Sequence, residues 1–151
     1  MRALTLYRPW PWAIFHGPAH CLKDVETRDW GADWIVGETV ALHAGKRIDT
    51  PERIAFIERV CGVRPPEDGG PTGIIGVVRF TAMVTASKSP WFMGPVGWQI
   101  GMRQALVEPV ACKGARKLWP VPADIERLVT ERRTAVPLRY IAGAGNAHRS
   151  T

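Results

Sequence analysis

Apolar and polar side chains alternate along much of the chain, in short runs separated by turn-forming residues. A period of two is typical of β-strands, because successive side chains of a strand point to opposite faces. In the run at 73–84 both the odd-numbered and the even-numbered positions are largely apolar, which is typical of a strand buried on both faces. The pattern predicts strands at 2–7, 22–28, 38–43, 73–84, 96–100 and 105–112.

Three other segments predict helices, at residues 10–15, 50–60 and 123–133. The middle one carries clear end signals, since Thr50 is a good N-cap, Pro51 suits the first helical position and Gly62 can end the helix. Proline-rich and glycine-rich loops are expected at 63–72 and 85–95.

About six short strands with two or three helices predict an α+β domain, because strand and helix do not alternate regularly. We expect a small, curved, barrel-like sheet. The length of 151 residues is that of one domain. We place that domain at residues 1–142 and expect 143–151 to be a flexible tail.

Charge and composition narrow the class of protein. The chain has 20 basic and 14 acidic residues, a net charge of +6, with Arg outnumbering Lys by 15 to 5. Arg favours planar, bidentate contacts with anionic partners. The chain also has seven Trp, which require either a large core or a stacking surface.

Other classes are not supported. No apolar run approaches the roughly 20 residues that span a membrane, and the first residues do not resemble a signal peptide. The cysteines Cys21, Cys61 and Cys112 are odd in number and far apart, unlike a disulfide scaffold or a thiolate zinc site. We therefore expect a cytoplasmic protein without a cofactor.

The strongest candidate for chemistry is the segment that contains Lys23, Glu26 and Arg28. In a strand Glu26 and Arg28 share a face, whereas Lys23 joins them only if the backbone turns near residue 24. A buried carboxylate and guanidinium can pair and still bind a ligand, and a nearby Lys without a carboxylate of its own can have a lowered pKa and act as a base. The alternative is a solvated edge strand of mixed charge.

Two further segments have candidate ligand-binding residues. Trp10 and Trp12 follow Arg8 in a proline-rich turn, and they do not share a helix face, so that one indole is expected to be exposed for stacking. The alternative is that both pack in the core.

His43 is predicted at a strand end, followed by Gly45 and two cations, an arrangement that can bind phosphate through backbone N–H groups. The alternative is a structural role, because a single histidine is more often a hydrogen-bonded part of the core than a ligand-binding residue.

A metal site is not expected. His16, His20 and Cys21 are close in sequence, but no fourth ligand is indicated.

Six segments, in order, resemble the motifs of ASCH domains, a branch of the PUA-like superfamily. The Lys-x-x-Glu-x-Arg segment corresponds to the signature of that family, and the resemblance extends over residues 2–122. The matching segments are LTLYRPWPWA (4–13), KDVETR (23–28), ALHA (41–44), GIIGVV (73–78), GWQI (97–100) and PVACKG with LW (109–119).

The chain departs from the family pattern at three positions. Cys21 replaces the leading glycine of the signature. Glu26 stands where related amidohydrolases that deacetylate a modified cytidine have Thr. Arg79 stands near the position of a later-strand Glu in many members.

The resemblance implies a PUA-like β-barrel flanked by helices, with a cleft for RNA or, more generally, for nucleic acid. We expect Glu26 to accept from an exocyclic amine, Arg28 to orient Glu26, Trp10 or Trp98 to stack on a base, and Lys23 to hold phosphate. Ligand contacts are predicted for Trp10, Trp12, Lys23, Glu26, Arg28, His43, Lys46 and Trp98. Contacts with the nucleic-acid backbone are predicted for Arg8, Lys113, Arg116, Lys117, Arg132 and Arg133.

Two alternatives remain open at this stage. One is a hydrolase of a modified nucleoside or of RNA, with Lys23 as general base and Glu26 as its partner. The other is a protein-interaction module that uses the Trp and Pro loops as binding hot spots.

Overall fold

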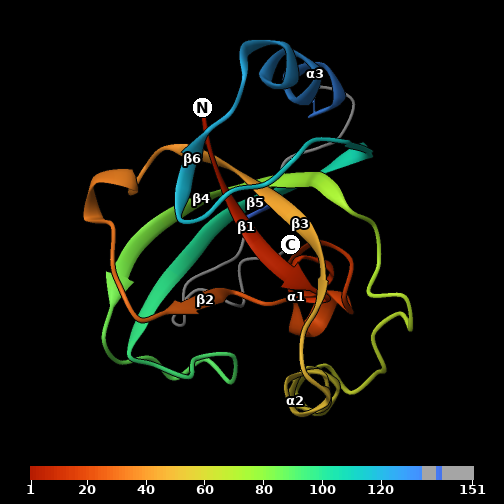
Figure 1. Cartoon of the computed structure of the whole chain (residues 1–151). Helices are drawn as coiled ribbons and strands as arrows, with labels where there is room; N and C mark the ends of the chain where they lie inside the picture. The colour runs from red at the N-terminus through yellow and green to blue at the C-terminus, as the bar shows by residue number, and fades with distance from the viewer. Residues whose placement is uncertain (134–138, 141–151) are drawn as a thin grey trace.

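The computed structural model describes residues 1–133 and 139–140, arranged as a curled sheet with three α-helices (Figure 1). The boundary expected near residue 142 and the expected tail lie outside the described residues. The strands are β1 (Arg2–Arg8), β2 (Val25–Arg28), β3 (Thr39–Ile48), β4 (Gly73–Val84), β5 (Val96–Val110), β6 (Leu118–Pro120) and β7 (Arg139–Tyr140). The helices are α1 (Trp10–Phe15), α2 (Pro51–Cys61) and α3 (Ala123–Arg133), with 3₁₀ turns η1 (Ala19–Cys21) and η2 (Asp33–Ile35).

The sheet is mixed and has the order β2-β5-β4-β3-β1-β6, with β7 paired to β5. Only β1 and β3 pair in parallel among the described strands. Register shifts interrupt the β1–β3, β3–β4 and β4–β5 ladders, and such irregularities bend strands and increase their twist. The sheet thus curls into a half-barrel, which confirms the predicted α+β class with a small curved sheet.

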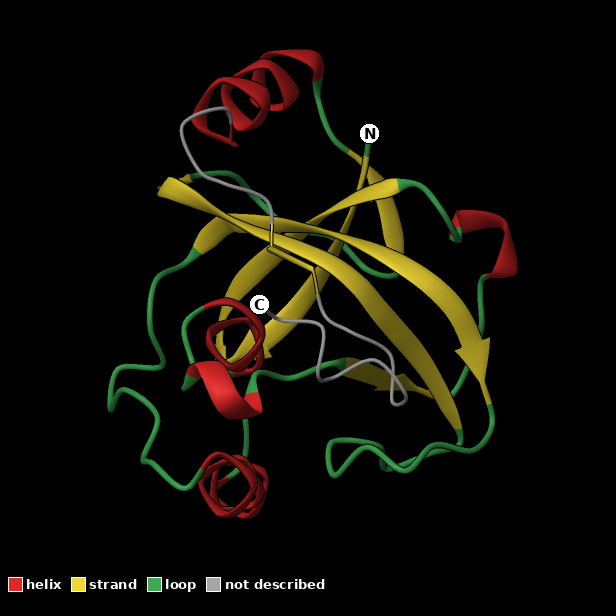
Figure 2. Cartoon of the chain, turned by 180° about the vertical axis from the view of Figure 1, so that it is seen from behind, coloured by secondary structure: helices red, strands yellow, loops and turns green. Residues whose placement is uncertain are grey.

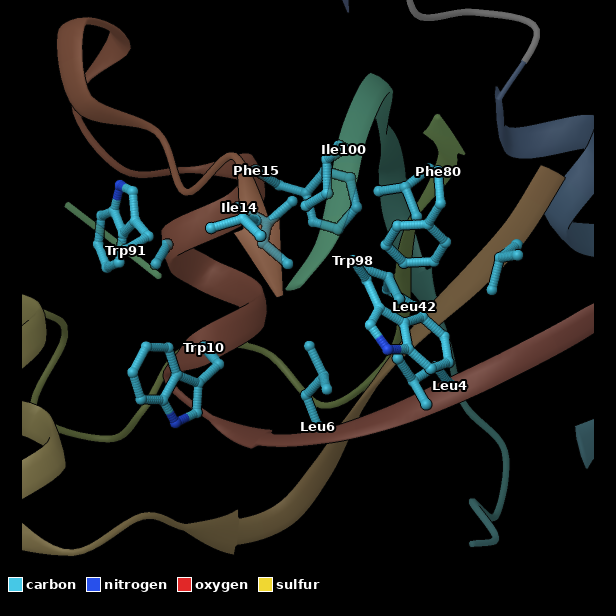
Figure 3. Packing of buried hydrophobic residues seen from close by; sticks show 14 of the residues in the cluster. Leu4, Leu6, Trp10, Ile14, Phe15, Leu42, Phe80, Trp91, Trp98 and Ile100 are labelled. Carbon is cyan, nitrogen blue, oxygen red and sulfur yellow. The ribbon is translucent and has the colours of Figure 1, made fainter. Parts of the chain in front are cut away.

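The curled sheet separates two apolar clusters. The larger cluster lies between the sheet and α1, where Leu4, Leu42, Phe80 and Trp98 are packed together (Figure 3). The smaller one lies on the other face, beneath α3, and includes Ile74. Helices α3 and α2 lie at opposite ends of the molecule, and the view from behind shows the same separation (Figure 2).

Helix α2 begins and ends where the sequence predicts. The Thr50 hydroxyl accepts a hydrogen bond from the Arg53 backbone N–H at 3.3 Å, and Gly62 ends the helix with a φ of +78°. Glycine adopts this left-handed conformation without strain. Within the described part of the chain, no helix has both the length and the apolar content needed to cross a membrane.

Four of the predicted strands need correction. The predicted strands at 96–100 and 105–112 are one continuous strand, β5, because the buried polar pair Arg103 and Gln104 is accommodated within it. Arg103 donates to the Ile14 carbonyl, and Gln104 donates to the Arg133 carbonyl at 2.6 Å. The second strand begins only at Val25, and β3 extends five residues beyond its predicted end at residue 43.

Candidate functional site

A cavity of about 1130 Å³ lies on the open side of the half-barrel, between β2 and the ends of β1 and β3. The loop at 111–117 and Met93 of the β4–β5 loop complete its wall. The cationic residues on its lining are Lys23, Arg28, Lys46, Arg53, Lys113, Arg116 and Lys117, whereas its acidic residues are Glu26 and Asp49. Such an excess of positive charge favours an anionic ligand.

Lys23, Glu26 and Arg28 meet at one wall of this cavity. The Lys23 Nζ lies 3.3 Å from Glu26 Oε1, and Arg28 Nη1 lies 3.2 Å from Glu26 Oε2. Glu26 and Arg28 share a face of β2, as the strand period requires. Lys23 reaches them because it precedes the strand, where its backbone N–H donates to the Ala13 carbonyl at 2.9 Å.

The Lys23 ammonium group is enclosed. Its side chain is 1% exposed, and Nζ donates to the Val25 carbonyl at 2.6 Å. Nζ also lies 4.8 Å from the ring centroid of Trp10 and 5.7 Å from that of Trp91. Burial lowers the pKa of Lys23 from its usual value, and the Glu26 carboxylate opposes that shift only in part. The site therefore contains an amine that loses its proton more easily than a surface lysine.

The two tryptophans expected to stack on a base do not provide an exposed ring. Trp98 is 0% exposed, since its ring packs edge-on against Trp30 and Phe80 and its indole N–H donates to the Trp30 carbonyl. The prediction that Trp98 binds a ligand is therefore wrong. Trp10 lines the cavity but is 7% exposed, and its indole N–H donates to Asp49 Oδ2 at 2.6 Å. Trp10 is a wall of the site and a partner of Lys23.

Trp12 and Arg8 do not line the cavity. Trp12 is half-buried against the main core, beside Gly70. The Arg8 guanidinium donates to four backbone carbonyls, those of Gly45, Lys46, Asp68 and Gly70. Its predicted role as a phosphate ligand is corrected to an anchor, which ties the end of β1 to β3 and to the loop at 63–72.

His43 lies inside β3 and not at a strand end, so the predicted phosphate-binding loop at this point is wrong. Nε2 lies 2.9 Å from the Cys112 carbonyl and must therefore carry the proton, which leaves Nδ1 as an acceptor. Burial lowers the pKa of His43, so the neutral ring is favoured. Nδ1 has no hydrogen-bond partner within the described residues. A Cβ on Gly114 would lie 2.7 Å from this atom, which explains why a glycine occupies that position.

The predicted backbone-binding cations divide into two groups. Lys113, Arg116 and Lys117 are exposed residues on the cavity lining, beside Lys46 of β3. Arg132 and Arg133 lie on α3, outside that lining, where they contact Pro109, Glu108 and Gln104. Of these residues, only Lys113, Arg116 and Lys117 can contact a ligand that extends out of the cavity.

The lining also contains residues that were not predicted from the sequence, among them Tyr7, Asp49, Arg53 and Met93. The exposure of Tyr7 could have been predicted from the sequence, because Tyr7 follows the buried Leu6 in a strand and therefore points away from the main core. Arg79, which the resemblance to ASCH domains places near a late-strand Glu position, lies outside the cavity and donates to Thr39 Oγ1 at 3.3 Å.

No protein-family model matches the chain, and no curated protein is significantly similar to it. Among residues 1–133 and 139–140, no three His, Cys, Asp or Glu side chains are grouped closely enough to hold a metal ion.

Proposed function

We propose that the protein binds nucleic acid, single-stranded RNA in particular, and that its cavity holds one base or nucleotide. One observation carries the proposal: Lys23, Glu26 and Arg28 converge in a cavity whose lining has seven cationic residues and two acidic ones. A carboxylate held between two cations on one wall can accept from the donor groups of a base. The surrounding cations can neutralise phosphate.

The roles of the residues follow from their positions. Glu26 accepts from an exocyclic amine of the base, and Arg28, whose Nη1 lies 3.2 Å from the Glu26 carboxylate, orients it. Lys46 and the loop cations Lys113 and Arg116 are exposed and contact phosphate groups. We also propose that the chain is an ASCH-like protein, since the residues of the signature motif are those that meet in the cavity.

Salt dependence tests this function. We expect the affinity for short single-stranded RNA to fall steeply with salt, because bound phosphates release their counterions. Lys113→Ala and Arg116→Ala should each weaken binding and reduce the slope of log affinity against log salt by about 1. The measurement is a fluorescence-anisotropy titration with RNA and DNA oligomers of matched sequence at several salt concentrations.

Lys88→Ala is the matched control, because Lys88 is exposed and lies outside the cavity. An affinity that does not change with salt would contradict the proposal. So would an equal loss of affinity in the Lys88 variant, because the interaction would then be a general attraction to a basic protein.

A second candidate function is hydrolysis of a modified nucleoside or of RNA. The observation that favours it is the enclosed Lys23, whose pKa is lowered by burial. A neutral amine can take a proton from an attacking water molecule, and Glu26, 3.3 Å away, would hold the ammonium that forms.

This second function predicts turnover that depends on Lys23. We expect the rate to rise with pH as Lys23 loses its proton, with an apparent pKa below the ordinary lysine value of 10.5. Lys23→Ala should abolish hydrolysis of an acetylated cytidine or of RNA while ligand binding persists. Lys88→Ala, which removes an exposed cation outside the cavity, should retain the turnover number. Absence of turnover in the unaltered protein would eliminate the enzyme function.

A further inference from the structure

We propose that Tyr7, together with Arg47, forms a second base-stacking subsite at the mouth of the cavity. This inference rests on the proposed function and makes it more specific: the ligand is a strand of at least two nucleotides, one in the cavity and its neighbour on Tyr7.

Tyr7 is the exposed aromatic residue of the cavity. Its side chain is 45% exposed and belongs to the cavity lining, whereas the Trp10 and His43 rings there are 7% and 5% exposed. Tyr7 is absent from both apolar clusters. Its ring therefore has little role in the core, and an aromatic face in water beside a cationic cavity is what base stacking requires.

The ring is held in place on both sides along the chain. Leu6 is buried in the core at 3% exposure, and Arg8 is anchored by four backbone carbonyls. Arg47 lies 5.1 Å from the centre of the Tyr7 ring, and its Nη1 donates to the Tyr7 hydroxyl at 3.2 Å. A preorganised aromatic ring loses little conformational freedom when a base binds.

The charges nearby suit a phosphodiester between two bases. Lys46 and Arg47 follow one another at the exposed end of β3, and Lys46 lines the cavity. A strand that leaves the cavity toward Tyr7 therefore passes two cations. Arg47 can also contact a base plane, because its guanidinium is planar and weakly hydrated.

The test compares mononucleotides with dinucleotides. Calorimetry measures the affinities of the unaltered protein, Tyr7→Ala and Tyr7→Phe. The ligands are the four ribonucleoside 5′-monophosphates and the matching homodinucleotides. The unaltered protein should bind the dinucleotide more tightly than the mononucleotide. Tyr7→Ala should reduce this gain by about 5- to 150-fold, the range expected from one stacked base, and should change mononucleotide affinity by much less. Tyr7→Phe should retain most of the gain, since the ring remains.

Trp34→Ala is the matched control. Trp34 is 59% exposed and has the Arg2 guanidinium 5.0 Å from its ring centre, the same kind of pair as Tyr7 and Arg47, but it lies outside the cavity. The inference is overturned if Tyr7→Ala still binds the dinucleotide more tightly than the mononucleotide by the same factor as the unaltered protein. It is also overturned if Trp34→Ala reduces that factor as much as Tyr7→Ala does. If no mononucleotide or dinucleotide binds at all, the proposed function itself fails and the subsite with it.

Discussion

Replacing Glu26 by Gln should weaken binding of a base-containing ligand by about 10- to 100-fold, because a hydrogen bond to a buried charged group contributes about 1.5–3 kcal/mol. Binding of inorganic phosphate or of a simple polyanion should be unchanged or tighter, since the variant removes a negative charge from a cationic cavity. A loss of affinity for the base-containing ligand without a loss for the anion separates recognition of a base from attraction of an anion. Calorimetric titration of one Glu26→Gln preparation with each ligand measures both.

The fold should tolerate this substitution. Glutamine has the shape of glutamate and can still accept from Arg28. The Glu26 carboxylate raises the pKa of Lys23 against the effect of burial, so its loss lets Lys23 shed its proton and avoid an unpaired buried charge. The melting temperature should thus fall only modestly. A large fall in melting temperature with unchanged ligand affinity would mean that the three residues brace the barrel and do not bind a base.

Replacing Gly76 by Ala should cost about 3 kcal/mol of folding free energy, at the upper end of the usual penalty for overpacking a core. A Cβ at this position of β4 would overlap Cζ and Cε1 of the Phe15 ring. The Phe15 ring or helix α1 would have to move, and α1 carries Trp10 and the Ala13 carbonyl that holds the Lys23 backbone. Ligand affinity should therefore fall together with stability. Urea unfolding followed by circular dichroism gives the free energy.

Gly31→Ala is the control for that experiment. The nearest atom to a Cβ at Gly31 is Val96 Cγ1, at an ordinary contact distance of 3.6 Å, so this variant should unfold close to the parent protein. Phe15→Leu in the Gly76→Ala background should recover part of the lost stability, because the smaller side chain gives space to the new methyl group. Equal stability of Gly76→Ala and Gly31→Ala would show that α1 is not tightly packed against the sheet.

Local signals explain which elements could be predicted from the sequence. The ends of α2 were predictable because Thr50, Pro51 and Gly62 act within one turn of the backbone. The strand β5 was split in the prediction because Arg103 and Gln104 are polar in sequence, whereas in the fold their polar atoms bond to Ile14 and Arg133, from distant segments. Such compensation depends on tertiary contacts and leaves no periodic signal.

In the candidate site, too, local signals predict some features, whereas others depend on tertiary contacts. The common face of Glu26 and Arg28 follows from the period of a strand, but the approach of Lys23 depends on a backbone bond to α1. Composition could count seven tryptophans but could not separate the core residue Trp98 from the exposed Trp34. The alternation along β1 shows that Tyr7 points away from the core, but only the folded chain places Tyr7 on the cavity lining.

A half-barrel differs from a closed barrel in having free edges, and a free edge can pair with the same edge of another molecule. Along the described path of the sheet these edges are β2 and β6. Both are short: β6 has three residues and ends in Pro120, which has no N–H to donate, and β2 has four residues and carries Glu26 and Arg28. Short length, proline and charge are the features that oppose edge-to-edge aggregation. The charged pair of the cavity thus also protects the open edge of the sheet from intermolecular β-pairing.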